Sequence, residues 1–324
     1  MIVSDWRLLP ASTTAQLYRR ERIRWRRRLA WETASTWHTL ETARTTWGLP
    51  GLVCHDHAGR VRGWTFYIVR HDRLEVGGFV ADDSLATRAL LDTLLDRARE
   101  WDGLSGFLYG NAPGLDEALM ASGVAVRSFL YLVRTLDPAT TSDGAPRAAG
   151  AAWPGEDLAA AARLFREAYG ETGRIFARHN QAHEWEEYVG NLVRDPACGV
   201  FSPALSRVIR TGDRDDALAI VTTIGPGTAH LAQIAAHPSV QGRGVAQQLL
   251  GDVLRSAREA GLSRMSLLVG GDNARARGLY ARMGFEERDR FVAVEGRPLR
   301  RIEKGDPGRT ARSAWHEDRT AIQS

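Results

Sequence analysis

The chain has few cysteines and no long apolar segment, and each of these shortages removes a class of protein. Its two cysteines, Cys54 and Cys198, lie far apart and without the spacing of metal ligands, so we expect reduced, structural thiols and no metal site. No apolar run approaches the roughly 20 residues that span a bilayer. The first residues lack the apolar core and cleavage site of a secretory leader. We therefore expect a cytoplasmic protein without a membrane partner.

The composition is that of a globular protein with a mild basic excess. The 324 residues are 44% apolar, which is enough to fill the cores of two ordinary domains. The net charge of +4 is carried almost wholly by arginine and would attract acidic ligands without implying nucleic acid. Apolar residues interrupt the densest basic run, residues 19–28, as in a helix with one packed and one solvated face. Without a recognised nucleic-acid fold we expect no nucleic-acid partner.

A segment rich in Pro, Gly, Ala, Ser and Thr divides the chain. Residues 137–154 lack apolar periodicity, which is typical of a linker. We therefore predict a first domain at residues 1–136 and a second at 155–302. The tail at 303–324 carries charges and turn formers without periodicity, so we expect it to be mobile.

The two predicted domains repeat one order of elements. In the first, alternating apolar patterns predict strands and helices in the following order: strands 52–55, 61–69 and 74–80, helix 85–99, strand 107–109, helix 115–121 and strand 129–133. The second is predicted to contain helices 157–169 and 185–192, strands 200–210, 217–223 and 229–236, a helix from residue 245, and strand 265–269. The predicted fold class is α/β, with mixed sheets flanked by helices.

The most informative motif is the glycine turn after the strand 229–236. It reads Gln241-Gly242-Arg243-Gly244-Val245-Ala246 and leads directly into a helix. Glycines let the backbone approach a ligand closely, and a helix start directs unpaired amides and the positive dipole end toward anions. Because glycines also mark ordinary turns, this pattern alone is a weak signal of a pyrophosphate site.

A second motif, Asn273-Ala274 before Leu279-Tyr280 and Gly284-Phe285, follows in a fixed order after the first. Together the two motifs resemble the GNAT superfamily of N-acetyltransferases, in which Gln241, Gly244 and Ala246 would match the acetyl-CoA loop. The resemblance implies two tandem GNAT-like domains, each with a mostly antiparallel mixed sheet. It also implies acyl-CoA-dependent N-acyltransfer, with a primary amine attacking acetyl-CoA directly while both substrates are bound.

The resemblance further implies which residues hold acetyl-CoA as the co-substrate. The backbone of the strand end would follow the pantetheine arm, and the loop amides would surround the pyrophosphate. The implied cofactor-binding residues are Ile234, Ala235, Ala236, Gln241, Gly242, Arg243, Gly244, Val245, Ala246, Asn273 and Tyr280. Asn273 has an equally good alternative role, since Asn often caps the start of a helix.

Tyr280 and His230 are the predicted catalytic residues. A phenol with a pKa near 10 is roughly matched to a departing thiolate, so Tyr280 is predicted to donate the proton. The alternative is a core aromatic, because Ala276, Leu279, Tyr280 and Met283 form a helical stripe. His230 is a candidate base because its reference pKa is about 6.5, although its place at the strand entrance favours the alternative of a histidine that faces solvent.

Three carboxylates of the helices before the strands are rival bases, namely Glu167, Glu171 and Glu187. Each could also recognise a cationic amine. His237, next to Pro238, is expected to shape the turn.

The first predicted domain has a different sequence at the equivalent positions. Asp82 and Asp83 follow its strand 74–80 where the glycine loop is expected, and Leu119 stands where Tyr280 does. Like charges repel, so carboxylates there would disfavour a pyrophosphate. We therefore expect a degenerate copy that serves as a scaffold or as a wall of the substrate site.

The sequence leaves the partner open. A small-molecule amine and a protein amine are both expected acceptors, and a second copy of the chain, as in a homodimer, is left open. The altered first copy motivates an alternative function, namely a non-catalytic acyl-CoA-binding sensor or adaptor.

Overall fold

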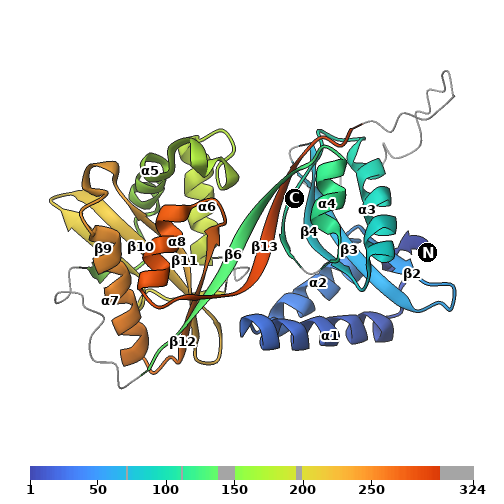
Figure 1. Cartoon of the computed structure of the whole chain (residues 1–324), viewed down its shortest axis with the longest axis horizontal. Helices are drawn as coiled ribbons and strands as arrows, with labels where there is room; N and C mark the ends of the chain where they lie inside the picture. Colours follow the sequence, from blue (N-terminus) through green and yellow to red (C-terminus); the bar gives the residue numbers. More distant parts are fainter. Residues whose placement is uncertain (71, 111, 138–149, 195–198, 300–324) are drawn as a thin grey trace.

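The computed structural model of the protein describes residues 1–70, 72–110, 112–137, 150–194 and 199–299 (Figure 1). The first half contains β1 Ile2–Asp5, α1 Ala11–Leu29, α2 Ala34–Thr46, β2 Gly51–His55, β3 Val61–Arg70, β4 Arg73–Ala81, α3 Ser84–Ala98, β5 Leu104–Tyr109, α4 Leu115–Ala121 and β6 Ala125–Thr135. The second half contains β7 Ala151–Ala152, α5 Leu158–Tyr169, α6 Ala182–Arg194, β8 Val200–Phe201, β9 Arg207–Thr211, β10 Arg214–Gly225, β11 Thr228–Ala236, α7 Val245–Glu259, β12 Arg264–Gly270, α8 Ala274–Arg282 and β13 Glu286–Gly296. The 3-10 helices η1 Trp6–Leu8, η2 Gly170–Ile175 and η4 Pro238–Val240 complete the description.

All the strands belong to one sheet of 13 strands, in the order β1-β2-β3-β4-β5-β13-β6-β12-β11-β10-β9-β7, with β8 paired to β10. Two neighbouring pairs, β4 with β5 and β11 with β12, are parallel, and the other recorded pairs are antiparallel. Helices cover both faces in each half. The predicted fold class, a mostly antiparallel mixed sheet flanked by helices, is confirmed.

The two halves exchange their last strands. β13, from the end of the second half, lies between β5 and β6 of the first half and is antiparallel to both. β6 in turn lies between β13 and β12 of the second half. Figure 1 shows these two long strands crossing the middle of the molecule side by side. The exchange joins what the sequence predicted as two sheets into one.

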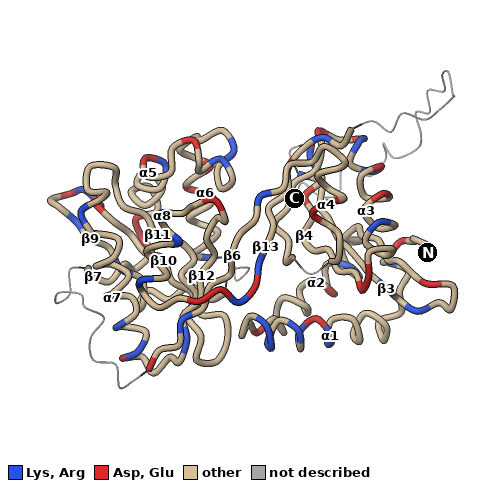
Figure 2. Tube along the Cα trace, viewed as in Figure 1, with Lys and Arg blue, Asp and Glu red and all other residues tan. Residues whose placement is uncertain are grey.

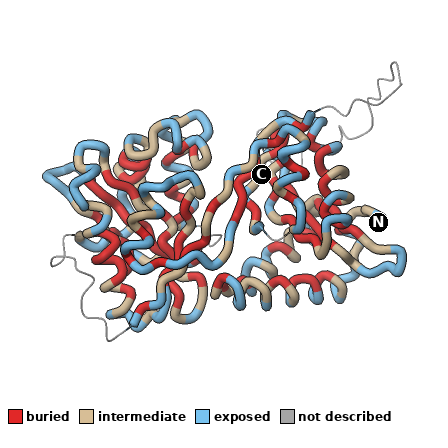
Figure 3. Tube along the Cα trace, viewed as in Figure 1, coloured by how far each residue is buried: buried red, intermediate tan, exposed pale blue. Residues whose placement is uncertain are grey.

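The core follows this exchange. Val292 and Val294 of β13 pack into the first-half cluster with α3 and α4, while Phe291 and Ala293 point to the opposite face. Alternation along a strand sends successive side chains to opposite faces, so both faces of β13 are covered. Figure 3 shows buried segments at the centre of each half and along the crossing strands.

The helical and strand patterns read from the sequence are largely confirmed, with ends that differ by a few residues. The helix predicted at 115–121 has the predicted bounds, and that at 85–99 is α3, Ser84–Ala98. The strands predicted at 61–69, 74–80 and 229–236 are β3, β4 and β11.

One predicted strand, 200–210, is wrong. The structure has two short strands there, β8 and β9, separated by a turn that contains Pro203. Proline has no N–H to donate to a ladder. In addition, the Ser206 hydroxyl donates to the carbonyl of Ser202 at 2.9 Å and accepts from the Val221 N–H at 3.0 Å, which fixes the turn against β10.

Four of the α-helices and strands were missed: β1, α2, β13 and the two-residue β7, which lies at 151–152 inside the predicted linker. β13 begins with the charged residues Glu286, Glu287, Arg288, Asp289 and Arg290, which do not alternate with apolar ones. Its first residues pair with β6 through a register shift between Glu287 and Asp289. The pairing therefore depends on backbone groups of a strand from the other half, which no local pattern indicates.

The basic run is the C-terminal part of α1, as Figure 2 shows. Five of its arginines lie within salt-bridge distance of carboxylates: Arg20 of Asp82, Arg22 and Arg26 of Glu32, Arg24 of Glu21, and Arg28 of Asp289. On α1, Leu17, Tyr18 and Leu29 are buried and Trp25 is half-buried, whereas Ile23 is 45% exposed. This is the predicted helix with one packed and one charged face, and its charge is largely balanced within the chain.

Several expectations concern residues outside the described ranges. Cys198 and the tail at 303–324 lie there, as does most of the predicted linker. Cys54 is described and is a buried free cysteine in β2, as expected. The predicted domain boundaries stay a prediction. Among the described residues, no helix combines the length and apolar character needed to cross a membrane.

Candidate active site

The centre of the candidate site is an opening between β11 and β12. These parallel strands pair from Thr228 with Arg264 to Leu231 with Leu267. Beyond Leu231 no pairing with β12 is recorded among the described residues, although β11 continues to Ala236. The two strands therefore diverge, and the last part of β11 presents one backbone edge to the opening.

A β-bulge lies where the pairing with β12 ends. On the β10 side, Ile220 pairs with Gln233 but the next residue, Val221, pairs with Leu231, so Ala232 is the extra residue of β11. A bulge bends the strand, increases its twist and redirects the following backbone groups. The bulge thus helps to separate β11 from β12.

The direction of the backbone groups beyond the bulge follows from one hydrogen bond. The His237 N–H donates to the Asp216 carbonyl on the β10 side at 2.8 Å. Backbone groups alternate in direction along a strand, so those of Ile234 and Ala236 point the other way, into the opening. The side-chain amide nitrogen of Gln241 donates to the Ala236 carbonyl there at 3.0 Å. The N–H groups of Ile234 and Ala236 are therefore directed at whatever enters the opening.

The glycine loop connects this edge to α7. Gly242 and Gly244 have φ values of +80° and +81°, a region that L side chains rarely adopt. A Cβ at either position would have no atom within 4 Å. Gly244 is the N-cap of α7 and no side chain accepts a hydrogen bond from the first turn. The first amides of α7 therefore have no side-chain cap, which together with the positive dipole end is what an anion site requires.

Nine of the residues predicted for acetyl-CoA lie along the strand end, the loop and the first helical turn, while Asn273 and Tyr280 belong to α8 and its cap. Ala235 and Ala236 are buried, Ile234, Val245 and Ala246 are half-buried, and Gln241, Gly242, Arg243 and Gly244 are exposed. Their binding of acetyl-CoA stays a prediction.

His237 shapes the turn at the start of this loop, as the sequence suggested. Its Nδ1 atom lies 2.7 Å from the Ser239 hydroxyl and accepts from the Ser239 N–H at 3.2 Å. Its Nε2 atom lies 3.0 Å from a carboxylate oxygen of Glu167 on α5. The loop is therefore connected to the helix above the sheet.

Asn273 caps α8. Its side-chain oxygen accepts from the Ala276 N–H at 3.0 Å, which satisfies one of the free amides of the first turn. The structure thus has the capping role that the sequence allowed for Asn273. Its predicted contact with the cofactor stays a prediction.

Tyr280 lies on α8 and is buried, with the ring edge-on to Phe285 at a centroid distance of 5.8 Å. Burial raises the pKa of Tyr280 above its usual value, which keeps the phenol protonated. Burial also raises the pKa of Tyr169, and the nearby Tyr280 phenol raises it further. Two phenols, one from α8 and one from α5, therefore lie within electrostatic reach of each other at the opening.

A hydrogen-bonded chain that the sequence did not indicate lies behind the bulge. The Tyr169 hydroxyl donates to the Gln233 side-chain oxygen at 2.6 Å and lies 3.2 Å from the Ile234 carbonyl oxygen. The Gln233 amide nitrogen donates to the Tyr188 hydroxyl of α6. The apolar periodicity placed Tyr169 on the packed face of its helix, but nothing in the sequence indicates that Gln233 points toward it.

His230 is buried, which contradicts the solvent-facing alternative. It is 3% exposed, its ring centroid lies 5.2 Å from that of Trp31, and its Nδ1 atom lies 2.9 Å from the Ser266 hydroxyl. Burial lowers the pKa of His230 to about 4, so the ring is neutral at pH 7. Its role as the base stays a prediction, and these surroundings favour a packing role.

The three rival carboxylates are spread over the helices above the sheet. Glu167 is the partner of His237, and Glu171 pairs with Arg174 at 2.7 Å on the surface. Glu187 is exposed on α6. The described part of the chain contains no cluster of three or more metal-ligating side chains.

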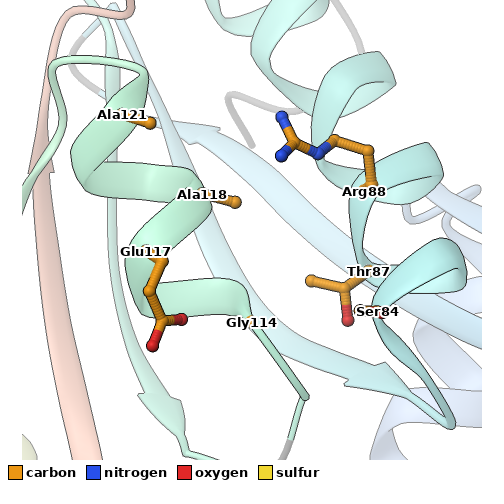
Figure 4. A pocket seen from close by; sticks show the side chains of 7 residues that line it. All are labelled: Ser84, Thr87, Arg88, Gly114, Glu117, Ala118 and Ala121. Atoms are coloured by element: carbon orange, nitrogen blue, oxygen red, sulfur yellow. The ribbon is translucent and has the colours of Figure 1, made fainter.

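The first half has a different arrangement at the equivalent place. Asp83 caps α3, since its carboxylate accepts from the Ala86 N–H at 2.8 Å, and it also pairs with Arg62 at 2.7 Å. A hollow of about 380 Å³ lies between α3 and α4, with Arg88 and Glu117 on opposite sides (Figure 4). The helix start that would hold an anion is therefore occupied by the protein's own carboxylate.

Comparison with known proteins agrees with this geometry. Residues 160–285 match the Acetyltransferase (GNAT) family. A GCN5-related N-acetyltransferase from Sphaerobacter thermophilus has 16% sequence identity and a TM-score of 0.61, with 92% of this chain and 96% of that chain covered. An acetyltransferase of the GNAT family from Colwellia psychrerythraea has 14% identity and a TM-score of 0.55, with 91% and 99% covered. None of the curated proteins compared with this chain matches its sequence.

The family match spans the opening, the glycine loop, α7 and α8, and the structural likeness extends over both halves of the fold. Over residues 160–285, this chain is similar to the acetyltransferase (GNAT) family.

Proposed function

We propose that this protein transfers the acetyl group of acetyl-CoA to a primary amine, with both substrates bound at once. The observation that carries the proposal is the continuity of the site. The open edge of β11 is followed, after one loop, by the start of α7, where the N-cap residue is a glycine and no side chain caps the helix. An extended arm that ends in a pyrophosphate has the shape and charge for such a site.

The glycine loop fits a pyrophosphate. Both glycines leave the space above the backbone open, and no side chain caps the first amides of α7. We assign the pyrophosphate to the amides of residues 242–246 and the pantetheine arm to the edge formed by Ile234 and Ala236.

When bound, acetyl-CoA supplies an acetyl group activated as a thioester. The amine nitrogen forms a bond to the carbonyl carbon while the carbon–sulfur bond breaks, and negative charge passes to the carbonyl oxygen. We assign the Ile234 N–H as the donor to that oxygen, because it is directed into the opening next to the bulge. Such a donor contributes on the order of 3 kcal/mol in comparable acyl transfers.

Tyr280 is proposed to give the departing sulfur its proton. Burial raises its pKa, so the phenol is protonated at neutral pH and can act as a donor. The attacking amine releases its proton to solvent water, and the Tyr280 phenol recovers its own proton from water after the thiol has left. A pKa of about 4 makes His230 a weak proton acceptor for an alkyl ammonium.

The test is a thiol-release assay of the full chain with acetyl-CoA and panels of small amines and peptide amines. We expect turnover with part of the panel, and a fall in kcat of about 10- to 100-fold for Tyr280→Phe. Acetyl-CoA affinity, measured by calorimetry, should stay within about twofold. Tyr18→Phe is the matched control, because Tyr18 is also a buried phenol but lies in the first half and donates to Glu41 at 3.0 Å.

The alternative is an acyl-CoA sensor that catalyses nothing, and the degenerate first half motivates it. A sensor would bind acetyl-CoA but give no turnover with any amine. In that case Tyr280→Phe would leave every measured property unchanged. If the wild type turns over and Tyr280→Phe lowers the rate while Tyr18→Phe does not, the sensor alternative is rejected.

A further inference from the structure

In the described part of the chain, the end of β11 is paired on one side only. Pairing with β12 has ended at Leu231, and the ladder with β10 is interrupted by the bulge at Ala232 and resumes from Gln233 to Ala236. A bulged residue is left unpaired and the ladder is disrupted around it. The backbone that follows must nevertheless hold the Ile234 N–H in a fixed direction if it is to act on a carbonyl oxygen.

Tyr169 reaches this backbone from α5. Its hydroxyl donates to the Gln233 side chain at 2.6 Å and lies 3.2 Å from the Ile234 carbonyl oxygen, so one proton is shared between two acceptors. These two acceptors belong to consecutive residues, and the Ile234 N–H lies between them in the chain. The Tyr169 hydroxyl therefore contacts the chain on either side of the Gln233–Ile234 peptide, which carries this N–H.

Gln233 is itself held from the other helix. Its amide nitrogen donates to the Tyr188 hydroxyl of α6, so its side-chain oxygen is turned toward Tyr169. Gln233 is 7% exposed, and a buried amide whose hydrogen bonds are made has one preferred orientation. Both helices above the sheet thus converge on the residue that follows the bulge.

The ring of Tyr169 has a separate task from its hydroxyl. It stacks on Trp185 at a centroid distance of 5.9 Å and contacts Phe176 at 5.4 Å. A phenylalanine would keep these ring contacts, since only the oxygen is lost. The packing and the hydrogen bonds of Tyr169 can therefore be separated by one substitution.

We propose that Tyr169 is a positioning residue of the acyl transfer, which holds the Ile234 peptide through Gln233 and the Ile234 carbonyl so that its N–H faces the thioester carbonyl. This inference rests on the proposed function for its catalytic consequence. Its structural part, the anchoring of the bulged strand, is independent of turnover.

The experiment compares Tyr169→Phe with Tyr18→Phe in the full chain. Tyr18 is a fair control because it too is a tyrosine on the first α-helix of its half, packs against aromatic rings and donates a hydrogen bond to a side chain. For Tyr169→Phe we expect kcat to fall about tenfold and KM for acetyl-CoA to stay within about threefold. The reason is that a misaligned Ile234 N–H weakens the hydrogen bond to the oxygen that becomes negative in the transition state, and affects ground-state binding little. For Tyr18→Phe we expect kcat within twofold.

Hydrogen exchange followed by mass spectrometry provides the second measurement. The peptide covering residues 229–237 should exchange faster in Tyr169→Phe than in the wild type, and should be unchanged in Tyr18→Phe. If the wild type shows no turnover, the proposed function fails, and this exchange difference still tests the anchoring. Unchanged exchange in Tyr169→Phe, or a kcat equal to that of the wild type, overturns the inference.

Discussion

The two halves of this chain have similar folds but differ in the segment that joins the bulged strand to the next helix. In both, the parallel strand pair separates after three or four residues and the next residue is bulged, Gly77 in β4 and Ala232 in β11. After β4 only Asp82 and Asp83 precede the helix, and Asp83 caps it. After β11 a loop of residues 237–244 ends at Gly244, the N-cap residue of α7, which has no side chain to accept a hydrogen bond from the first turn. One residue type at the helix start decides whether the amides are available to a ligand.

The space beside the bulge differs as well. In the first half the Phe66 ring covers Gly77 and Gly78, and a Cβ on either glycine would meet that ring. Phe66 stacks on Trp6 and Trp64, so aromatic rings fill this region. In the second half, the corresponding region contains Tyr169 and Gln233, whose polar groups bond to one another and to the strand. The first half thus has a similar strand geometry, with aromatic rings where the second half has these polar groups.

The exchanged strands give the first half a structural role. Each half lacks a strand that the other supplies, so neither sheet is complete without its partner.

The largest expected effect comes from separating the halves. Residues 1–136 expressed alone should show no cooperative thermal unfolding, because they lose β13 and with it Val292 and Val294, which are 0% and 2% exposed. Each such side chain contributes about 1.5–3 kcal/mol, against a total stability of about 5–15 kcal/mol for a domain. Circular dichroism checks this. Mixing with residues 150–324 should restore a cooperative transition, whereas a sigmoidal melt of residues 1–136 alone would show that the exchange is dispensable.

The glycine loop can be tested against a matched turn. Gly244→Val should weaken acetyl-CoA binding about 100-fold or more, because valine cannot adopt the φ of +81° without strain and its side chain enters the open space. Gly59, with a φ of +76° and equally open surroundings, lies in the turn between β2 and β3 of the first half. Gly59→Val should leave affinity unchanged in calorimetry. Equal losses in both variants would indicate general destabilisation.

His230 should make stability depend on pH. Its pKa is about 4 in the folded protein and about 6.5 when unfolded, so between these values the unfolded chain binds an extra proton. Neutral His230 contributes fully to the free energy of unfolding above pH 6.5. This contribution, at most about 3 kcal/mol, is lost as the pH falls toward 4. Denaturant unfolding at several pH values would show this. His230→Asn, which keeps a polar atom near Ser266, should have a flatter dependence, and an unchanged dependence would contradict the assignment.

The smallest expected effect concerns the degenerate half. Asp83→Ala removes the cap of α3 and should lower the unfolding free energy by about 1 kcal/mol, because one amide of the first turn loses its acceptor. The melting temperature reports this. Acetyl-CoA binding measured by calorimetry should not change. A second, weaker binding event in Asp83→Ala would show that the carboxylate alone had closed the first half to the ligand.

Much of the site was readable from the sequence because its signals are local. Gly242 and Gly244 indicate positive φ values by residue type, and the helix that follows has an apolar face that periodicity shows directly. Asn273 indicated a helix start, and it caps α8. By contrast, the direction of Gln233 depends on Tyr169 and Tyr188, which are far away in the sequence and reach it only after α5 and α6 have packed on the sheet.

By itself, the sequence determined the order of elements, the duplicated plan and the place of the glycine loop, because propensity, periodicity and turn chemistry act between near neighbours. Only the tertiary structure decided that β6 and β13 change places, that His230 is buried against Trp31, and that Tyr169 reaches the end of β11. These features depend on which distant backbone edges and side chains meet. That is settled by the free energy of the whole packed sheet and not by any one segment.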